Sequence, residues 1–549
     1  MSVSAQATTR GGGRGLRGLA HAVILSEGWR RRLIAVGAGM VGALAMAPLD
    51  LLPAMAVSLS LAVWLIDGAG HAREDGRGAL AASLRAAFAD GWFWGFGYFL
   101  AGLWWIGEAF LVEPDKFAWL LPLGVLGLPA GLALFPALGF ALARLMWSPR
   151  GVRVLGLAAG LTAAEWLRGN ILTGFPWNVP GMALGGHLVL AQAASLVGVW
   201  GLTLLAVAIC AAPATLADPG RRPLAAAPIV WAFAAFAGLI GFGALRLSAE
   251  PPKPVPGVKL RIMQPDLPQD AKFRPSNRDA ILKRYLDLSD RATSPERTGV
   301  SDVTHLIWPE SAFPFILARD AAALAQIGAA LKGRTHLITG AAREGGARDF
   351  YNSIQVVAPN GAILDSVDKV HLVPFGEYLP FEPMFRALGI TQFVHIPGGF
   401  TPGPRRRALT APGLPPLAPL VCYEAIFSGE VLPADGAVAA MLNVSNDAWF
   451  GRLAGPWQHF AHARLRAVEQ GLPMIRAANS GVSAVIDPYG RVIASLPVGV
   501  ADVIDSALPQ ATRRPLFAAL GHLPALALGL VFGAAALAGR LRRRGLSAG

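Results

Sequence analysis

Two cysteines stand in the chain, and Cys422 is the one placed where a thiol could act as a nucleophile. The apolar run 417–421 predicts a buried strand that ends at Cys422, and Glu424 adds a carboxylate two residues later. The C-terminal end of a strand is where α/β enzymes often place a nucleophile. An isolated cysteine in an apolar strand is nevertheless more often an inert core residue, as we expect for Cys210 inside a long apolar run. The segments before Cys422 must therefore supply a base and a positive charge if the thiol is to react.

Two earlier segments follow the same plan, in which a strand ends and an ionisable side chain comes next. The predicted strand 305–308 runs into Glu310, and the segment 368–380 offers Lys369 and Glu377. Each residue also has a simpler interpretation: Glu310 as a neighbour of a helix N-cap, Lys369 as a solvated loop charge and Glu377 as an ion-pair partner. The order glutamate, lysine, cysteine, with each residue after a strand, is much less expected by chance.

A carboxylate, an ammonium group and a thiol at one sheet edge could together catalyse acyl transfer. Glu310 would take the proton of the Cys422 thiol and later activate an acceptor amine. Cys422 would attack a carbonyl carbon and hold the acyl group as a thioester. Lys369 and the backbone N–H of Tyr423 would stabilise the developing oxyanion.

The composition indicates an integral membrane protein. Of 549 residues, 54% are hydrophobic and 15% are charged, against about 25% charged residues in soluble domains. The net charge of +13 comes from arginines at the ends of apolar runs, which favours membrane topology over nucleic-acid binding. We expect no metal and no cofactor: His459 and His462, three residues apart on a predicted helix, are interpreted as polar surface, and the chain has no phosphate-binding glycine loop.

Eight apolar runs predict membrane-spanning helices, although the first two are short and also compatible with a helical hairpin. They lie near 33–48, 51–67, 87–111, 118–146, 152–168, 188–212, 224–246 and 516–538. The loops after runs two, four and six carry most of the loop arginines: Arg73, Arg77, Arg85, Arg150, Arg153, Arg221 and Arg222. The positive-inside rule then places both termini in the cytoplasm and residues 250–512 on the outer side.

The predicted organisation alternates membrane and soluble parts. It comprises a basic cytoplasmic tail (1–32), a seven-helix transmembrane domain (33–246), a linker (247–256), a catalytic domain on the outer side (257–512), a final transmembrane helix (516–538) and a basic cytoplasmic tail (539–549). Within the catalytic domain, strands are predicted near 258–263, 305–308, 336–339, 353–358, 417–421, 438–444, 473–476 and 483–486, and helices near 276–292, 321–331 and 456–470. This alternation predicts a layered α/β domain, with residues 381–416 as a mobile lid.

Several motifs resemble those of a known family. Trp308–Glu310, Asp368–His371 and Val421–Glu424 resemble the Glu–Lys–Cys signatures of the nitrilase superfamily. The longer stretches Lys369–Pro380 and Asn443–Gly451 resemble motifs of the bacterial apolipoprotein N-acyltransferases. The resemblance implies a polytopic α-helical membrane domain of about eight transmembrane helices and an extracytoplasmic nitrilase-like α-β-β-α sandwich.

The resemblance also implies an activity, which is the last step of lipoprotein maturation. Members of the family move an acyl chain from a phospholipid, typically phosphatidylethanolamine, through a cysteine thioester to the α-amino group of the diacylglyceryl-cysteine that begins an apolipoprotein. The motifs then assign the base to Glu310, the electrophilic helper to Lys369 and the nucleophile to Cys422. Glu377 matches a supporting glutamate, and the remaining matches near the site are Tyr423, Glu424, Asn352 and Trp449. We expect a monomer in the bacterial inner membrane that needs the lipid bilayer and no nucleic acid.

Two alternatives remain open. A membrane-anchored nitrilase-type amidase would use water as the acceptor, but a simple anchor needs one helix rather than eight. A lipid-binding or transport protein with an inactive outer domain would not need the glutamate, lysine and cysteine. The apolar runs also contain almost no charge at mid-membrane depth, which ion-coupled carriers usually need.

Overall fold

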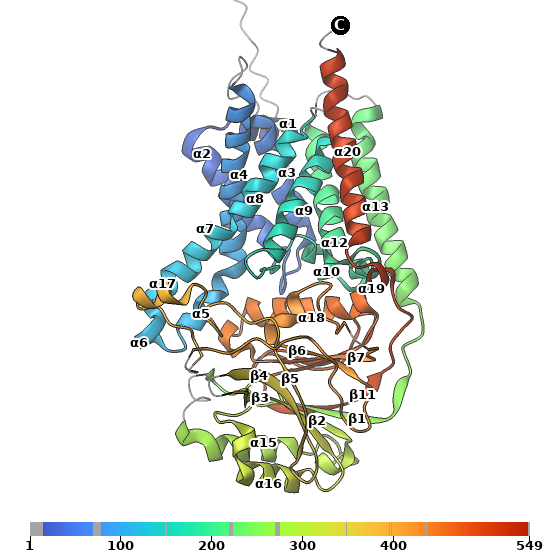
Figure 1. The fold of residues 1–549 in the computed structure, drawn as a ribbon. Helices are drawn as coiled ribbons and strands as arrows, with labels where there is room; N and C mark the ends of the chain where they lie inside the picture. Colours follow the sequence, from blue (N-terminus) through green and yellow to red (C-terminus); the bar gives the residue numbers. More distant parts are fainter. Residues whose placement is uncertain are drawn as a thin grey trace, which may run out of the picture.

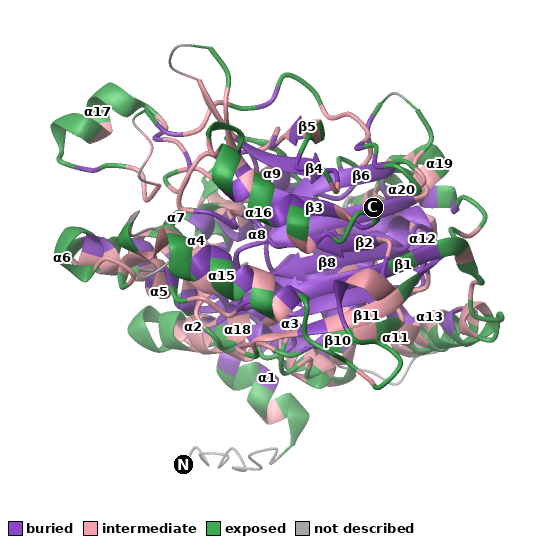
Figure 2. Ribbon diagram, turned by 90° about the horizontal axis from the view of Figure 1, so that it is seen from below, coloured by how far each residue is buried: buried purple, intermediate pink, exposed green. Residues whose placement is uncertain are grey.

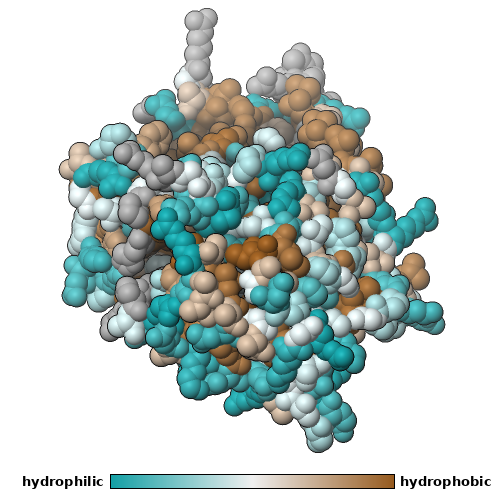
Figure 3. Space-filling model, turned by 60° about the horizontal axis from the view of Figure 1, so that its bottom comes forward, coloured by the Kyte–Doolittle hydropathy of each residue, from teal (hydrophilic) through white to brown (hydrophobic). Residues whose placement is uncertain are grey.

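A computed structural model shows a helical part stacked on a two-sheet part, and the first and last described helices, α1 (Leu16–Ile24) and α20 (Leu523–Leu546), belong to the helical part (Figure 1). It describes residues 15–69, 78–148, 151–218, 223–269, 275–346, 349–394, 396, 398–434 and 436–546. Hydrophilic side chains cover much of the sheet end, whereas hydrophobic ones gather towards the helices (Figure 3). The two parts therefore present different surfaces to their surroundings.

The helical part contains the eight apolar runs that were predicted to span the membrane. Its helices are α1 (Leu16–Ile24), α2 (Gly28–Ala43), α3 (Leu52–Gly68), α4 (Ala79–Leu103), α5 (Gly107–Phe110), α6 (Pro114–Phe117), α7 (Leu128–Leu132), α8 (Leu134–Leu145), α9 (Arg153–Asn170), α10 (Met182–Gly185), α11 (Leu188–Ala191), α12 (Ala194–Ala211), α13 (Pro223–Leu247), α19 (Leu516–Leu520) and α20 (Leu523–Leu546). Within the described residues, four helical stretches are long and apolar enough to cross a membrane: Pro114–Leu145, Ala194–Ala217, Ala227–Leu247 and Leu523–Arg542. The other predicted spans stay predictions.

Small residues allow the helices to approach closely. A Cβ atom on Gly39 of α2 would lie 1.9 Å from the backbone oxygen of Trp94 in α4, and one on Gly97 would lie 2.1 Å from that of Val36. Any larger side chain there would force α2 and α4 apart, as expected where helices pack without water.

The structure describes only some of the arginines on which the predicted membrane orientation depends. Arg73, Arg77, Arg150, Arg221 and Arg222 lie outside the described residues. Arg85 lies within α4. Arg153 was expected in a loop but is the first residue of α9, where it is buried and ion-paired with Asp67 and Asp218 at 3.3 and 2.6 Å.

The other part is a sandwich of two sheets. One has the order β11-β1-β2-β3-β4-β5 and the other β10-β9-β8-β7-β6, and helices cover the outer faces (Figure 1). The strands are β1 (Pro254–Gln264), β2 (His305–Ile307), β3 (His336–Glu344), β4 (Phe350–Val357), β5 (Ile363–Asp368), β6 (Leu417–Val421), β7 (Ala440–Ser445), β8 (Met474–Ala478), β9 (Ser483–Ile486), β10 (Val492–Leu496) and β11 (Asp502–Pro509). The helices are α15 (Arg278–Ser289), α16 (Ala321–Ala330), α17 (Glu382–Ala387) and α18 (Ala454–Gln470).

The core lies between the sheets, where the central strands are buried (Figure 2). β1, β2 and β3 run parallel, as do β6, β7 and β8. Parallel neighbours end at the same edge of a sheet, so the loops after them gather in one place. The β2 and β6 loops carry Glu310 and Cys422.

The helix α18 separates the sheets from the helical part, and it corrects one prediction. His459 and His462 were expected on a polar surface, but both are buried, at 0% and 1% exposure. α18 packs on the sheet on one side and on α12 and α10 on the other, so it has no solvent-facing side for them. Gln458 of α18 accepts hydrogen bonds from the indole N–H groups of Trp105 and Trp177 in the helical part.

Candidate active site

Glu310, Lys369 and Cys422 come from three distant parts of the chain and meet in one place. Glu310 lies three residues beyond β2, Lys369 follows β5, and Cys422 begins the short 3-10 helix η8 (Cys422–Ile426) directly after β6. Lys369 Nζ lies 3.9 Å from Glu310 Oε1, and all three side chains line the same cavity. The structure thus brings together the three residues that the sequence singled out.

A second carboxylate and an amide complete the group around Lys369. Glu377 Oε2 lies 2.7 Å from Lys369 Nζ and also accepts the backbone N–H of Val373 at 2.8 Å. The Asn352 side-chain amide donates to both Glu310 and Glu377, each at 2.8 Å. Glu377 and Asn352 therefore hold the base and the lysine in fixed positions.

Burial and charge set the protonation states in this group. Burial would lower the pKa of Lys369, but the carboxylates of Glu377 and Glu310 outweigh it and raise that pKa, so the lysine stays charged. Burial raises the pKa of Glu310, against the effect of Lys369. Burial also raises the pKa of Cys422, and the Glu310 carboxylate adds to this. The resting site therefore holds a protonated thiol next to a base of raised proton affinity.

The backbone at Cys422 is held in an unusual conformation. Its φ of +51° lies in the left-handed region, which costs a residue with a Cβ free energy. The carbonyl of Cys422 accepts hydrogen bonds from His459 Nε2 at 3.0 Å and from the Asn443 amide at 3.3 Å. These bonds hold the turn that presents the sulfur to the cavity.

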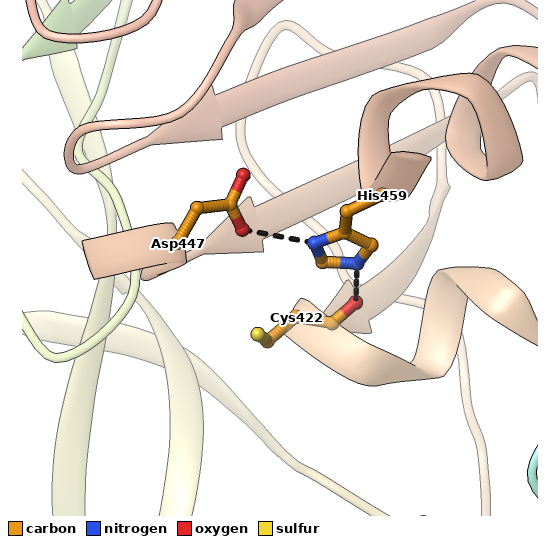
Figure 4. A group of neighbouring side chains, drawn as sticks. All are labelled: Cys422, Asp447 and His459. Carbon is orange, nitrogen blue, oxygen red and sulfur yellow. Dashed lines mark hydrogen bonds and ion pairs between the residues drawn. The ribbon is translucent and has the colours of Figure 1, made fainter. Parts of the chain in front are cut away.

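The group Cys422, His459 and Asp447 looks like a cysteine–histidine–aspartate triad, but its geometry excludes that role. The imidazole faces the carbonyl oxygen of Cys422 rather than its sulfur (Figure 4). His459 Nδ1 lies 2.8 Å from Asp447 Oδ1, so both ring nitrogens are engaged. The three residues also offer ligand atoms within 4.8 Å of one another, but the imidazole nitrogens already contact Asp447 and the Cys422 carbonyl. This arrangement indicates a brace rather than a base or a metal site.

Asp447 is anchored in turn by buried partners. Arg476 donates to Asp447 Oδ2 at 2.7 Å, and the Ser445 hydroxyl donates to Oδ1 at 2.6 Å while lying 3.4 Å from Cys422 Sγ. Burial would raise the pKa of Asp447, but Arg476 and His459 lower it, so the carboxylate stays ionised. Burial and Arg476 lower the pKa of His459.

The remaining residues from the motifs have distinct contacts. Glu424 is 2% exposed and accepts the backbone N–H groups of Val370 and His371, each at 3.1 Å, and that of Val421 at 2.8 Å. It therefore ties the loop that carries Lys369 to the turn that carries Cys422.

Tyr423 and Trp449 connect the site to its surroundings. The Tyr423 hydroxyl donates to the carbonyl of Gly174 in the helical part at 2.9 Å. The half-buried Trp449 lines the cavity and lies 6.0 Å from the ring of Phe393.

The cavity has a volume of about 1350 Å³ and extends from Glu310, Lys369 and Cys422 to the helical part. Its lining includes Leu123, Leu128 and Leu132 from the apolar stretch Pro114–Leu145. Aromatic residues make up much of the remaining wall: Trp105, Phe110, Phe175, Trp177, Phe313, Phe315, Phe350, Phe375, Phe385, Phe393, Phe400 and Phe450. Several of these belong to the predicted lid 381–416, whose mobility stays a prediction and whose residues 395 and 397 lie outside the described residues. A long apolar chain fits such a space.

Comparisons with known proteins agree with this arrangement. Residues 38–212 match the model of the apolipoprotein N-acyltransferase N-terminal domain, and residues 262–516 match that of the carbon-nitrogen hydrolases. The chain is 51% identical over 518 residues to an apolipoprotein N-acyltransferase of Rhodopseudomonas palustris, covering 93% of this chain and 95% of the relative. The chain belongs to the apolipoprotein N-acyltransferase family.

Other relatives give the same result. An apolipoprotein N-acyltransferase of Bradyrhizobium diazoefficiens is 50% identical over 524 residues, covering 93% of this chain and 96% of the relative. Among solved structures, an amidase of the nitrilase superfamily from Nesterenkonia AN1 aligns with 48% of this chain and 94% of its own, at 18% identity and a TM-score of 0.34. The match of residues 262–516 to the carbon-nitrogen hydrolase model identifies the two sheets as the carbon-nitrogen hydrolase domain of an apolipoprotein N-acyltransferase.

Sequence reasoning missed the brace behind Cys422. Asp447 lies inside the motif Asn443–Gly451, but no role was predicted for it, and His459 was assigned to the surface. Arg476 gave no signal, since one arginine in a short strand has no pattern around it. The presence of Asp447 in a matching motif was the one available clue.

Proposed function

We propose that the protein transfers an acyl chain from a membrane phospholipid to the α-amino group of a diacylated apolipoprotein, through a thioester on Cys422. The observation that carries this proposal is the cavity, because one space contains the candidate nucleophile and reaches the apolar stretch Pro114–Leu145. Phosphatidylethanolamine is the donor we expect, and the family membership supports the apolipoprotein acceptor.

In the first half-reaction, Cys422 Sγ attacks the carbonyl carbon of the donor ester while Glu310 takes the thiol proton. Lys369 Nζ and the backbone N–H of Tyr423 stabilise the oxyanion. The carbon–oxygen bond then breaks, and Glu310 returns its proton to the leaving oxygen, which releases a lysophospholipid. The raised pKa of Glu310 suits a group that must both accept and donate this proton.

In the second half-reaction, the amine of the acceptor attacks the thioester carbon and Glu310 takes a proton from the amine nitrogen. The carbon–sulfur bond breaks, and the proton restores the Cys422 thiol. The products are an N-acylated lipoprotein and free enzyme. The acyl group has then moved from an ester to an amide, the more stable bond, so no nucleotide is needed.

The proposal includes eight membrane spans, a periplasmic catalytic domain and cytoplasmic termini, in a monomer of the bacterial inner membrane. Moving an acyl chain from a bilayer into water costs about 0.8 kcal/mol per CH₂. A cavity that adjoins membrane helices lets both lipid substrates keep their chains out of water. This is the physical reason for joining a hydrolase-type domain to so many helices.

A two-stage assay tests the proposed function. The purified protein is mixed with phosphatidylethanolamine labelled in its acyl chain, and a diacylated lipopeptide is added afterwards. We expect a hydroxylamine-sensitive adduct on Cys422 that passes to the lipopeptide. Release of the label to water alone would indicate an amidase-type hydrolase. If no adduct forms and Cys422→Ala behaves like wild type in this assay, the result would indicate a lipid-binding protein.

A further inference from the structure

The cavity wall contains a buried amide to which the mechanism above gives no task. Gln269 lies five residues beyond the end of β1, is 5% exposed and lines the same cavity as Glu310 and Cys422. Its side-chain nitrogen Nε2 is buried and has no hydrogen-bond partner among the residues that the structure describes. A buried amide donor without a partner is unfavourable, so a bound ligand that accepts this hydrogen bond would be stabilised there.

Hydrogen bonds to the backbone determine which end of the Gln269 amide is free. Asn479 accepts the N–H of Leu267 at 3.1 Å through Oδ1 and donates to the carbonyl of Leu267 at 2.8 Å through Nδ2. A backbone N–H only donates and a carbonyl only accepts, so the orientation of Asn479 is fixed. Asn479 Nδ2 also donates to Asn446 Oδ1 at 3.0 Å.

The orientation of Asn479 also fixes the orientations of the Asn446 and Gln269 side-chain amides. Because its oxygen faces Asn479, Asn446 turns its NH₂ group towards Gln269 and donates to Oε1 at 2.7 Å. The oxygen of Gln269 is thus occupied, and Nε2 is the end left for a ligand. The ligand atom must therefore be an acceptor, such as a carbonyl or ester oxygen.

The strand order shows which part of the substrate this donor can reach. Gln269 follows β1 and Glu310 follows its neighbour β2, whereas Lys369 follows β5 at the far edge of the same sheet. Asn446 likewise follows β7, next to β6, which carries Cys422. Gln269 and Lys369 thus lie on opposite sides of Glu310. If Lys369 binds the oxygen of the attacked carbonyl, Gln269 faces the other part of the substrate, which exchanges a proton with Glu310.

We propose that Gln269 is a substrate-binding residue. Its Nε2 donates a hydrogen bond to an oxygen of the substrate group that exchanges a proton with Glu310. In the first half-reaction that group is the glycerol part of the donor phospholipid, and in the second it is the N-terminal residue of the acceptor lipopeptide. The bond would orient the leaving oxygen or the attacking amine towards Glu310. This inference rests on the proposed thioester mechanism.

Gln269→Met tests it, because methionine keeps the length and loses the donor. We expect formation of acyl-Cys422 from phosphatidylethanolamine, its transfer to the lipopeptide, or both, to slow by about tenfold or more, as expected for a lost hydrogen bond to substrate. A slower first step would assign the bond to the phospholipid, and a slower second step would assign it to the lipopeptide. Gln269→Glu, which keeps the contact with Asn446 but presents an acceptor oxygen, should slow the same step.

Two controls make the result decisive. The rate at which methyl methanethiosulfonate, which has no carbonyl, modifies Cys422 should be unchanged in Gln269→Met. Gln355→Met, at a buried glutamine of β4 that does not line the cavity, should keep wild-type rates. Wild-type rates of both half-reactions in Gln269→Met would overturn the inference, and so would a parallel loss of Cys422 modification, which would mean a purely structural role. Failure of wild-type protein to form acyl-Cys422 would instead refute the proposed function.

Discussion

The polar groups on the two sides of Cys422 differ in what they contact. On the cavity side, Glu310 and Lys369 reach the space where a substrate can lie. On the opposite side, His459 and Asp447 are fully buried, and the hydrogen bond that His459 makes to the cysteine goes to its carbonyl oxygen. The comparison teaches that a histidine and a carboxylate beside a cysteine need not be catalytic, because the atom that they contact decides their role.

Loss of the positive charge on the cavity side should have the largest effect. Lys369→Met removes the ammonium group that we assign to the oxyanion and leaves Glu377 without its ion pair, so we expect acyl transfer to fall by about 10⁴-fold. The measurement is the rate of lipopeptide acylation. Lys332→Met, at an exposed ion pair, is the matched control and should stay within about twofold of wild type. Retention of more than a tenth of wild-type activity in Lys369→Met would contradict the assignment.

Removal of the base should cost somewhat less. Glu310→Gln keeps the shape and the hydrogen bond from Asn352 but cannot take a proton, so we expect a loss of about 10²–10⁴-fold in kcat. Single-turnover formation of acyl-Cys422 gives the rate of the affected step. Glu344→Gln, at the end of β3 and outside the cavity lining, serves as the control. Equal rates in Glu310→Gln and wild type would remove Glu310 from the mechanism.

The brace should show a smaller effect of a different kind. His459→Ala removes the donor to the Cys422 carbonyl and one partner of the buried Asp447. We expect a loss of about 1–3 kcal/mol in stability and about 10–100-fold in activity. His459→Gln, which can still donate to the carbonyl, should recover part of both. If His459 were the base instead, His459→Gln would be as inactive as Glu310→Gln.

The smallest expected change is a shift of the pH profile. Burial raises the pKa of Glu310, and a base works only when ionised, so kcat/KM should fall on acidification at a higher pH than an ordinary glutamate would allow. The amide of Asn352 favours the ionised form and opposes this rise. Asn352→Leu should therefore move the acid limb of kcat/KM to still higher pH. An unmoved limb would mean that Glu310 is not the group that titrates.

The sequence predicted the strands before Glu310 and Cys422 because both have clear apolar patterns, whereas the strand before Lys369 has none. The runs before Glu310 and Cys422 are β2 and β6, as expected. β5, β10 and β11 were missed since their residues are partly exposed and their alternation is weak. The brace and Gln269 were missed for another reason. Their roles depend on contacts between β1, β7, β8 and α18, which no local pattern reveals.

The most direct test of the account is the mass of the peptide that carries Cys422 after the protein has been mixed with phosphatidylethanolamine and no acceptor. We predict that this peptide gains one acyl group, which hydroxylamine removes, and that His459→Gln still acquires it while Lys369→Met does not. Acylation of a lipopeptide by protein that never carries an acyl group on Cys422 would contradict the account.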